Sequence, residues 1–303
     1  MNAVPPLTIG LPVYNGEHFL AEAVESILAQ KYGDFAMVVS DNASTDGTEE
    51  IGRQFAALDP RVRYVRHDVN RGAAWNFNQL VHTTDGPFFK WAAHDDLLLP
   101  TWLGECMQAL VDRPEAVLSF TRRCRIDEHG EVVRHNRARS LRFTSPDAPP
   151  SERFADWLRL RRGCIEVFGV TRRATMLQTG LLGSFTASDR VYLGEMLLRG
   201  PFAEVPEVLF LHREHDGRSV RRTRREGELL SWFDTAKSGK VSFPTWRLGY
   251  EYVRAVRRAP LPREERWRSY AALGRWTRRR WRMLGDNVVD AGRTVVRRAL
   301  PPG

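Results

Sequence analysis

The chain has 303 residues, of which 42% are hydrophobic and 27% charged, and its formal net charge is +9 at pH 7. This length supports a sizeable core in one or two domains, and the composition excludes a fibrous or intrinsically disordered protein. No run of about 18 consecutive apolar residues occurs, so we expect no transmembrane helix.

The N-terminus and the cysteines bear on the cellular location. The short apolar run over residues 7–13 is interrupted by a glycine and a proline, which favours a strand over a signal peptide. The three cysteines are far apart, at Cys106, Cys124 and Cys164. Their spacing argues against a disulfide framework or a zinc cluster and fits a reducing compartment, so we predict a cytoplasmic protein.

Charge is distributed unevenly along the chain. Residues 1–120 contain 8 Lys and Arg against 16 Asp and Glu, a net charge of −8. Residues 121–303 contain the remaining 38 against 21, a net charge of +17. An acidic half suits a metal site, and a basic half suits an anionic surface or ligand.

The first 120 residues alternate between strand and helix patterns. Apolar runs predict strands over residues 8–14, 35–40, 61–67 and 88–93. Helical periodicity predicts helices over residues 17–31, 46–58, 70–84 and 101–111, the last with Thr101 as its N-cap. Nearly all-apolar strands that alternate with helices indicate a parallel sheet covered on both faces. Ligands of such a sheet bind at the carboxyl ends of its strands.

The pattern changes after residue 115. We expect strands over residues 117–122 and 202–211, with a hairpin turn at 128–131 and a polar loop at 136–152. Helices are predicted near 152–162, 173–182 and 189–199, and from about residue 221 the chain is interpreted as helices rich in Arg and Trp.

Polar clusters stand where the first strands should end. They are Pro12 to Glu17, Asp41 to Gly47, Asn70 to Gly72, and His94 to Asp96. Ordinary turn chemistry would explain any one of them, since Asn, Asp, Gly and Ser favour turns. Four in succession, the last with two adjacent carboxylates, favour a site for a nucleoside diphosphate and a divalent metal.

These residues resemble the nucleotide-sugar-binding half of the family 2 glycosyltransferases over residues 6–100. The resemblance rests on the segments 11–15, 40–48 and 70–72 and on the aspartate pair, and it continues more weakly to about residue 219. It implies an α/β GT-A fold, with a Rossmann-like, mostly parallel central sheet and flanking helices, divided into a nucleotide-sugar-binding half (1–120) and an acceptor-binding and catalytic half (121–220). Beyond the resemblance, the residues themselves predict a helical, basic, Arg/Trp-rich C-terminal extension (221–303).

The resemblance assigns roles to the donor side of the site. Pro12 and Tyr14 match positions that line the base, where an aromatic ring can stack on a pyrimidine. Glu17 lies near this pocket, and Asp41 matches the carboxylate that accepts a hydrogen bond from the base. Asp96 would position the metal shell or the donor sugar. The donor-binding set implied in this way is Pro12, Tyr14, Glu17, Asp41, Asn70, Arg71 and Asp96.

The metal assignment also comes from the resemblance. Asp95 matches the last aspartate of the family's Asp-x-Asp motif and would bind Mg²⁺ or Mn²⁺ that bridges the donor diphosphate. Ala93 stands where many relatives have the first aspartate, so metal affinity is expected to be lower or to depend on His215. Arg213 is expected to pair with phosphate. A surface histidine in a charged loop is the ordinary alternative for His215.

A second polar segment, residues 185–190, supplies the catalytic candidate. It resembles the acidic pair on the family's acceptor side, with Ser188 in place of the usual first acid. Asp189 would then be the general base that removes the proton of the acceptor hydroxyl. The alternative is that Ser188 and Asp189 only cap the following helix.

The C-terminal segment is strongly basic. Residues 246–303 contain 15 Arg and 5 Asp and Glu, interleaved with Trp246, Trp267, Trp276 and Trp281. Arg and Trp on an amphipathic helix suit the headgroup region of an anionic membrane, which would fit a lipid-linked acceptor. A solvated helical face or a homo-oligomer contact is the ordinary alternative. No recognition motif supports nucleic-acid binding.

The sequence therefore predicts a metal-dependent, inverting transfer of a sugar from a nucleoside diphosphate donor, with uridine or thymidine as its base, to a glycan or lipid-linked hydroxyl. A nucleotidyltransferase of similar fold is an alternative, although residues 12–17 lack its Gly-rich, basic phosphate loop. A non-catalytic, membrane-associated nucleotide-sugar-binding protein is the other, because Ala93 and Ser188 replace expected acids. We expect a cytoplasmic protein that binds the inner face of the membrane peripherally.

Overall fold

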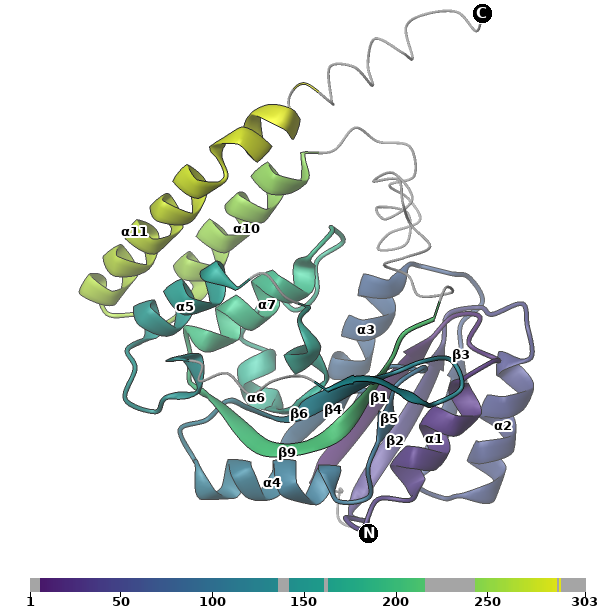
Figure 1. Cartoon of the computed structure of the whole chain (residues 1–303). Helices are drawn as coiled ribbons and strands as arrows, with labels where there is room; N and C mark the ends of the chain where they lie inside the picture. The colour runs from purple at the N-terminus through teal and green to yellow at the C-terminus, as the bar shows by residue number, and fades with distance from the viewer. Residues whose placement is uncertain (1–5, 136–141, 161–162, 216–242, 288, 290–303) are drawn as a thin grey trace, which may run out of the picture.

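The computed structural model describes residues 6–135, 142–160, 163–215, 243–287 and 289 (Figure 1). Within them, helices flank a nine-stranded sheet with the order β3-β2-β1-β4-β8-β6-β9-β5, and β7 pairs with β6. The strands are β1 (Leu7–Val13), β2 (Phe35–Asp41), β3 (Val62–Arg66), β4 (Phe88–Trp91), β5 (Leu97–Leu98), β6 (Leu118–Ile126), β7 (Val132–His135), β8 (Val170–Arg172) and β9 (Phe202–Arg213). The α-helices are α1 (Leu20–Leu28), α2 (Thr48–Leu58), α3 (Ala73–His82), α4 (Trp102–Asp112), α5 (Pro150–Arg159), α6 (Arg173–Met176), α7 (Ser188–Leu197), α10 (Pro244–Arg258) and α11 (Arg263–Arg279). Two short 3₁₀ turns, η1 (Arg142–Thr144) and η2 (Ile165–Phe168), complete the described elements.

The first four strands form the parallel part of the sheet. β1 lies in the middle, between β2 and β4, and β3 pairs with β2, all in parallel. Every residue of β1 is buried, because helices cover both faces. Leu7, Ile9 and Leu11 face a core shared with α1 and α4, while Val38 of β2 faces a core shared with α3 and α7. The predicted α/β architecture with a mostly parallel sheet and flanking helices is confirmed.

Pro12 is buried within this central strand. A proline removes one ladder hydrogen bond, so it is tolerated only where no partner needs its N–H. The carbonyl of Gly10 accepts a hydrogen bond from the Ala92 amide at 2.9 Å, so the backbone polar groups of residue 10 face β4. Those of residue 12 face the same side, but the last register pair of β1 with β4 is Gly10–Trp91. Pairing with β4 has therefore ended before Pro12, so the missing N–H of the proline costs no hydrogen bond between these strands.

The second part of the sheet is mixed. β8 runs antiparallel to β4 and β6, β9 runs parallel to β6, and β5 runs antiparallel to β9. The hairpin at 128–131 is confirmed by the antiparallel pairing of β6 with β7. The sequence missed β8 and β5, which have only three and two residues, and the helix expected over 173–182 is reduced to α6. Thr101 occupies the N-cap position of α4 but makes no capping side-chain hydrogen bond.

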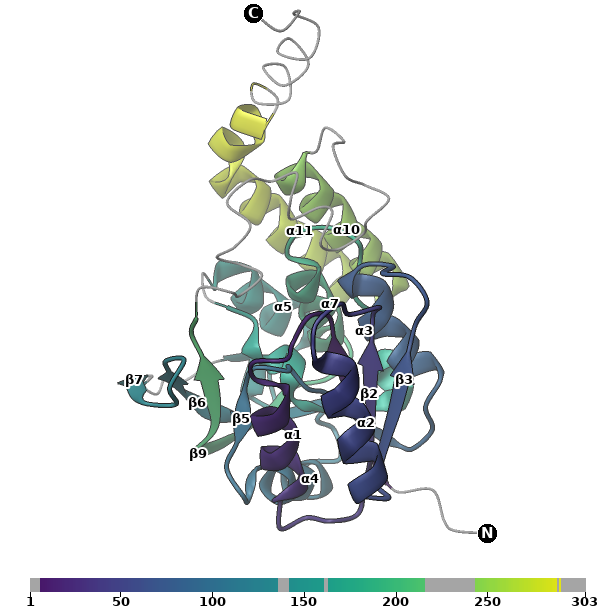
Figure 2. The ribbon, with the colours of Figure 1, turned by 90° about the vertical axis from the view of Figure 1, so that its right-hand side faces the viewer.

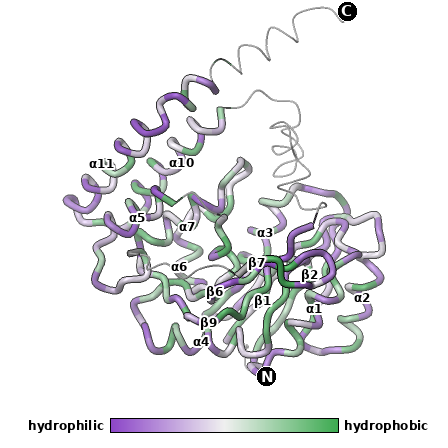
Figure 3. Tube along the Cα trace, in the orientation of Figure 1, coloured by the Kyte–Doolittle hydropathy of each residue, from purple (hydrophilic) through white to green (hydrophobic). Residues whose placement is uncertain are grey.

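The helices α5, α7, α10 and α11 pack together beside the sheet (Figures 1 and 2). Their shared core includes Phe154, Val191, Tyr252, Leu273 and Trp276. Hydrophobic residues concentrate in the strands, whereas α11 is largely hydrophilic along its length (Figure 3). No helix in the described part of the chain is long and apolar enough to cross a membrane. The basic segment predicted from residue 221 lies partly outside the described residues, at 221–242 and 290–303.

Candidate functional site

The polar clusters predicted at the ends of the first strands lie at one edge of the parallel sheet. Parallel strands bring their carboxyl ends to the same edge, so loops that are far apart in sequence become neighbours. The loops that follow β1, β2 and β3 are joined by hydrogen bonds, and the segment after β4 meets the end of β9. The edge therefore carries two hydrogen-bonded groups of polar segments.

The loops after β1 and β2 are connected by reciprocal hydrogen bonds. The Asn15 amide donates to Ser44 Oγ at 2.9 Å, and the Thr45 amide donates to Asn15 Oδ1 at 2.9 Å. The Gly47 amide donates to Glu17 Oε2 at 2.8 Å. Asn15 has a φ of 52°, a conformation that Asn tolerates better than most residues. Glu17 thus holds the second loop, and its predicted place beside the base stays a prediction.

Asn42 links the second loop to the third. Its Nδ2 donates to Asn70 Oδ1 at 2.9 Å, and its Oδ1 accepts from the Arg71 amide at 3.1 Å. Asn70 Oδ1 also accepts from the Gly72 amide at 2.8 Å. The sequence placed Asn42 in a polar cluster but gave it no role. Its position directly after Asp41, at the end of a buried strand, was the available signal.

Asp41 lies beneath the surface of the site. Its Oδ2 accepts from the Tyr64 hydroxyl at 2.6 Å and from Arg66 at 2.9 Å, while its Oδ1 accepts from the Ser44 amide at 2.8 Å. The side chain is 0% exposed. Burial and the neighbouring Asp41 carboxylate raise the pKa of Tyr64, so the phenol stays a donor. Because Asp41 is 0% exposed, a base could reach its carboxylate only if a neighbouring group moved aside.

Tyr14 and Pro12 differ in their access to a ligand. The Tyr14 side chain is 45% exposed at the start of the first loop, where its ring is open to stacking. Pro12 is buried inside β1, as described above. The side chain of Arg71 lies over the Trp75 ring, with its guanidinium carbon 4.7 Å from the ring centroid. Tyr14 is thus an exposed aromatic group among the predicted donor residues.

Asp95 and His215 come together although 120 residues separate them. His215 Nε2 lies 3.1 Å from Asp95 Oδ2, and the His215 ring packs on Phe19 with centroids 4.6 Å apart. A carboxylate oxygen and an imidazole nitrogen suit Mn²⁺, and one or two carboxylates with substrate phosphates suffice for Mg²⁺. No group of three or more potential ligands from His, Cys, Asp and Glu occurs among the described residues. The pair therefore fits a metal that takes its remaining ligands from the substrate and water.

Asp96 points into the protein rather than toward the loops. It is 6% exposed, and its Oδ1 accepts from the Arg213 amide at 3.0 Å and lies 3.0 Å from His212 Nδ1. These bonds attach the segment after β4 to the last residues of β9. The geometry supports a role for Asp96 in shaping the site, while its predicted contact with the donor sugar stays a prediction.

Arg213 is a buried positioning residue. Its Nε donates to the Asp95 carbonyl at 3.0 Å, one terminal nitrogen donates to Glu22 Oε2 at 2.6 Å, and the other donates to the Glu128 carbonyl at 2.8 Å. The side chain is 1% exposed. The expected pairing of Arg213 with phosphate is wrong, because internal partners occupy its guanidinium. Neither Arg213's role nor that of Glu22 could be recognised from local sequence.

Asp189 is the second residue of α7. Its Oδ1 accepts from the Arg190 amide at 2.8 Å, and Ala187 before the helix has a φ of 64°. Burial raises the pKa of the Asp189 carboxyl, which increases its strength as a base. Ser188 is buried, and its hydroxyl has no hydrogen-bond partner among the described residues. Capping by Ser188 is therefore not what holds this turn.

Arg190 fixes the start of α7 to its surroundings. Its guanidinium donates to the Leu160 carbonyl at 2.6 Å and lies 5.3 Å from the centroid of the Trp157 ring. Its own carbonyl accepts from the Trp157 indole at 2.8 Å and from the Tyr252 hydroxyl at 3.3 Å. The backbone next to Asp189 is thus tied to α5 and α10.

Known proteins resemble this chain in sequence and in fold. The family described as Glycosyl transferase family 2 matches residues 8–176, more than half of the chain. The EpsE protein of Bacillus subtilis, named as a glycosyltransferase, is 35% identical over 101 residues, which cover 33% of this chain and 36% of EpsE. The chain thus spans about a third of the length of that curated relative.

Two solved structures share the fold. TarS of S. aureus in complex with UDP-GlcNAc gives a TM-score of 0.67 at 14% identity and covers 95% of this chain and 81% of that chain. The mannosyltransferase PcManGT of Pyrobaculum calidifontis, in complex with GDP-Man and Mn²⁺, gives 0.50 at 16% identity and covers 96% and 87%.

Proposed function

The chain belongs to glycosyltransferase family 2, and from this premise we propose that it transfers a sugar from a nucleoside diphosphate donor to a hydroxyl acceptor with inversion. The observation that carries the proposal is the meeting of Asp95 and His215, 3.1 Å apart, at the edge where the polar loops of the parallel strands converge. That edge is where open α/β sheets bind ligands.

The donor nucleotide is assigned to the loops after β1, β2 and β3. Tyr14 would stack on the base, and the connected loops would hold the nucleoside between Asn70, Arg71 and Glu17. Structures of similar fold bind UDP-GlcNAc and GDP-Man, which supports a nucleotide-sugar donor. UDP- and dTDP-sugars are the donors we propose, and the UDP-GlcNAc complex of the structurally similar TarS supports a pyrimidine base.

Asp95 and His215 would hold a Mg²⁺ or Mn²⁺ ion. When bound, the ion supplies positive charge that stabilises the diphosphate leaving group. The Mn²⁺ complex of the structurally similar mannosyltransferase supports this cofactor. Arg213 keeps the Asp95 backbone in place, so that the carboxylate is oriented before a ligand arrives.

Asp189 would act as the general base. Its carboxylate takes the proton of the acceptor hydroxyl as that oxygen forms a bond to the anomeric carbon of the donor sugar. The bond from the anomeric carbon to the diphosphate breaks in the same step, and the electron pair leaves with the diphosphate. One displacement from the opposite face inverts the anomeric configuration. Burial raises the pKa of Asp189, so its carboxylate is a stronger base than that of an ordinary aspartate.

The acceptor is proposed to be a glycan or a lipid-linked sugar. Trp246 and Tyr250 are exposed on one face of α10, at 52% and 57%, and the segment is rich in Arg. An anionic membrane surface suits such a face, which would make the protein peripheral on the cytoplasmic side. Contact between copies of the chain is the alternative use of this face.

The division of the chain at residues 120 and 220, into a donor-binding half, an acceptor-binding half and a C-terminal extension, stays a prediction.

The test is a panel of UDP-, dTDP- and GDP-sugars with Mg²⁺ or Mn²⁺, in which release of the nucleoside diphosphate is measured. We expect metal-dependent release with one donor, which chelation by EDTA abolishes. Tight binding without release would favour the non-catalytic alternative. Release of pyrophosphate from a nucleoside triphosphate would instead identify a nucleotidyltransferase.

A further inference from the structure

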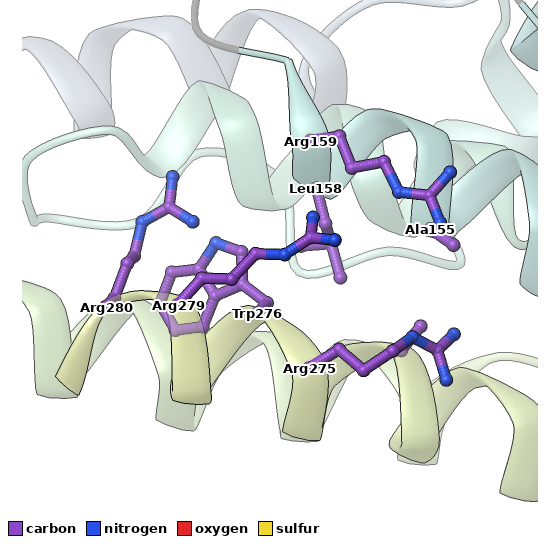
Figure 4. A pocket seen from close by; sticks show the side chains of 8 residues that line it. Ala155, Leu158, Arg159, Arg275, Trp276, Arg279 and Arg280 are labelled. Atoms are coloured by element: carbon purple, nitrogen blue, oxygen red, sulfur yellow. The ribbon is translucent and has the colours of Figure 1, made fainter.

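A hollow between α5 and α11 is lined by arginines from both helices (Figure 4). Arg159 comes from the last turn of α5, and Arg275, Arg279 and Arg280 come from the last turns of α11 and the residue after it. The hollow has a volume of about 70 Å³ and opens to solvent. It belongs to the helical layer and contains none of the predicted donor or catalytic residues.

The shape of the hollow follows from small side chains. Ala155 on α5 and Ala272 on α11 lie in its lining, where a larger residue would fill it. Trp276 is 4% exposed and forms its floor. The guanidinium of Arg280 lies 4.6 Å from the centroid of that ring, so a cation–π contact fixes one positive group beside the opening.

Four arginines line the hollow, and its lining contains no acidic residue. Among the described residues, Arg159, Arg275 and Arg279 have no hydrogen-bond or carboxylate partner. Other arginines of the same helices do have partners: Arg268 of α11 pairs with Glu264 at 2.5 Å, and Arg153 of α5 donates to the Leu197 carbonyl at 3.0 Å. Arg159, Arg275 and Arg279 are exposed, so their guanidinium groups are open to an anion from solvent. An anion in the hollow would be attracted by the positive charge of its lining.

We propose that this hollow binds a phosphate group, which would be a site separate from the transfer reaction. Phosphate presents several oxygens in different directions, so guanidinium groups from two helices can each donate to it. The volume accommodates one such group and leaves its substituent in solvent. The phosphate can come from a lipid headgroup or be free in solution, and the same chemistry recognises both.

The first experiment measures binding of inorganic phosphate by calorimetry, with chloride keeping the ionic strength constant. The variant Arg159→Gln/Arg279→Gln should bind about tenfold more weakly than the wild type, because it loses charge-assisted donors from both sides of the hollow. The matched control is Arg278→Gln/Arg282→Gln, which removes the same charge from exposed positions outside the hollow. The control should retain the wild-type affinity. All substituted side chains are exposed, so circular dichroism should show unchanged folding.

The second experiment distinguishes the sources of the phosphate. Flotation with vesicles of phosphatidylglycerol mixed with phosphatidylcholine compares the same two variants. A larger loss of flotation in the hollow variant than in the control supports a lipid headgroup as the ligand. Equal flotation with unequal phosphate affinity supports a free phosphate. If the two variants bind inorganic phosphate equally well, the proposal is overturned, whatever the result of the donor panel.

Discussion

The carboxylates of the site differ in how far their oxygens are used inside the protein. Asp41 is completely buried and accepts three hydrogen bonds, and Asp96 is buried against the end of β9. Asp95 instead directs Oδ2 to His215, at a site edge where the loops converge. The Asp95 side chain is 14% exposed and that of Asp96 is 5% exposed. Carboxylates that accept several internal hydrogen bonds hold loops in place, so Asp41 and Asp96 have structural roles, whereas the proposed metal would bind at Asp95.

Replacing Asp189 tests the base. Asp189→Asn keeps the size of the side chain and its acceptor oxygen for the Arg190 amide, but it cannot take a proton. We expect kcat to fall by about 10²- to 10⁴-fold, the usual contribution of a general base. Calorimetric affinity for the nucleoside diphosphate should be unchanged. Turnover near that of the wild type would remove Asp189 from the mechanism.

Replacing Arg213 tests the support of Asp95. Arg213→Gln loses the bonds to the Asp95 and Glu128 carbonyls and to Glu22, so Mn²⁺ affinity should weaken by about tenfold, as is typical for residues that orient a metal ligand. Mn²⁺ titration of the protein alone measures this without reference to activity.

The matched control is Glu22→Gln, which leaves the bond from Arg213 to the Asp95 carbonyl in place. It should keep most of the Mn²⁺ affinity. Equal losses in the two variants would show that Arg213 acts through general stability and not through Asp95.

At the scale of elements, the site depends on three loops that behave as one unit. The second loop is held on one side by Asn15 and Glu17 and on the other by Asn42. Loops lose much conformational entropy when they are ordered, so bonds between them prepare the site before a donor binds. If the donor binds as proposed, contact with one loop would bring it to three loops that are already joined.

Asn42→Ala tests this connection. It removes the bonds to Asn70 and to the Arg71 amide, and we expect weaker donor binding and a loss of about 1–3 kcal/mol in the free energy of unfolding. Asn78→Ala is the control, because Asn78 makes two similar bonds, to the Leu182 carbonyl and amide. Both variants should lose similar stability in urea. If both variants also lost similar donor affinity, the effect of Asn42→Ala would come from lower stability and not from the connection between the loops.

At the scale of the whole molecule, one sheet joins the two halves, and a buried lysine lies at their junction. Lys90 of β4 donates to the Phe168 carbonyl at 2.6 Å, which ties the parallel strands to the 3₁₀ turn before β8. Its ammonium lies 4.2 Å from the centroid of the Trp102 ring. The side chain is 1% exposed, and burial lowers the pKa of Lys90 to about 7. The junction therefore carries a group that changes charge near neutral pH.

Stability should rise with pH above neutrality because of this lysine. Its pKa is about 7 in the folded protein and 10.5 as the ordinary value, so between these values the unfolded chain binds more protons. The free energy of unfolding should increase by up to about 1.4 kcal/mol per pH unit across that window. Urea unfolding at several pH values compares the wild type with Lys90→Met, whose slope should be lower. Equal slopes would show that Lys90 does not titrate in this way.

The sequence by itself determined the parallel strands and the polar edge. Apolar runs such as 35–40 indicate strands that are buried on both faces of the sheet. Because these strands are parallel, the residues after Val13, Asp41 and Trp91 lie at one edge of the sheet. These features are local or follow from topology, so periodicity and turn residues suffice to predict them. The short strands β5 and β8 lacked such a pattern, because their pairing comes from neighbours distant in sequence.

Only the tertiary structure decided which polar side chains are paired inside the protein. It brought His215 to Asp95, buried Asp41 and Arg213 among internal partners, and assembled arginines of α5 and α11 around one hollow. Whether a charged group has a partner depends on contacts between segments that are more than a hundred residues apart in the sequence. No local pattern predicts those contacts, because the free energy of a polar group depends on its burial and on its partners together.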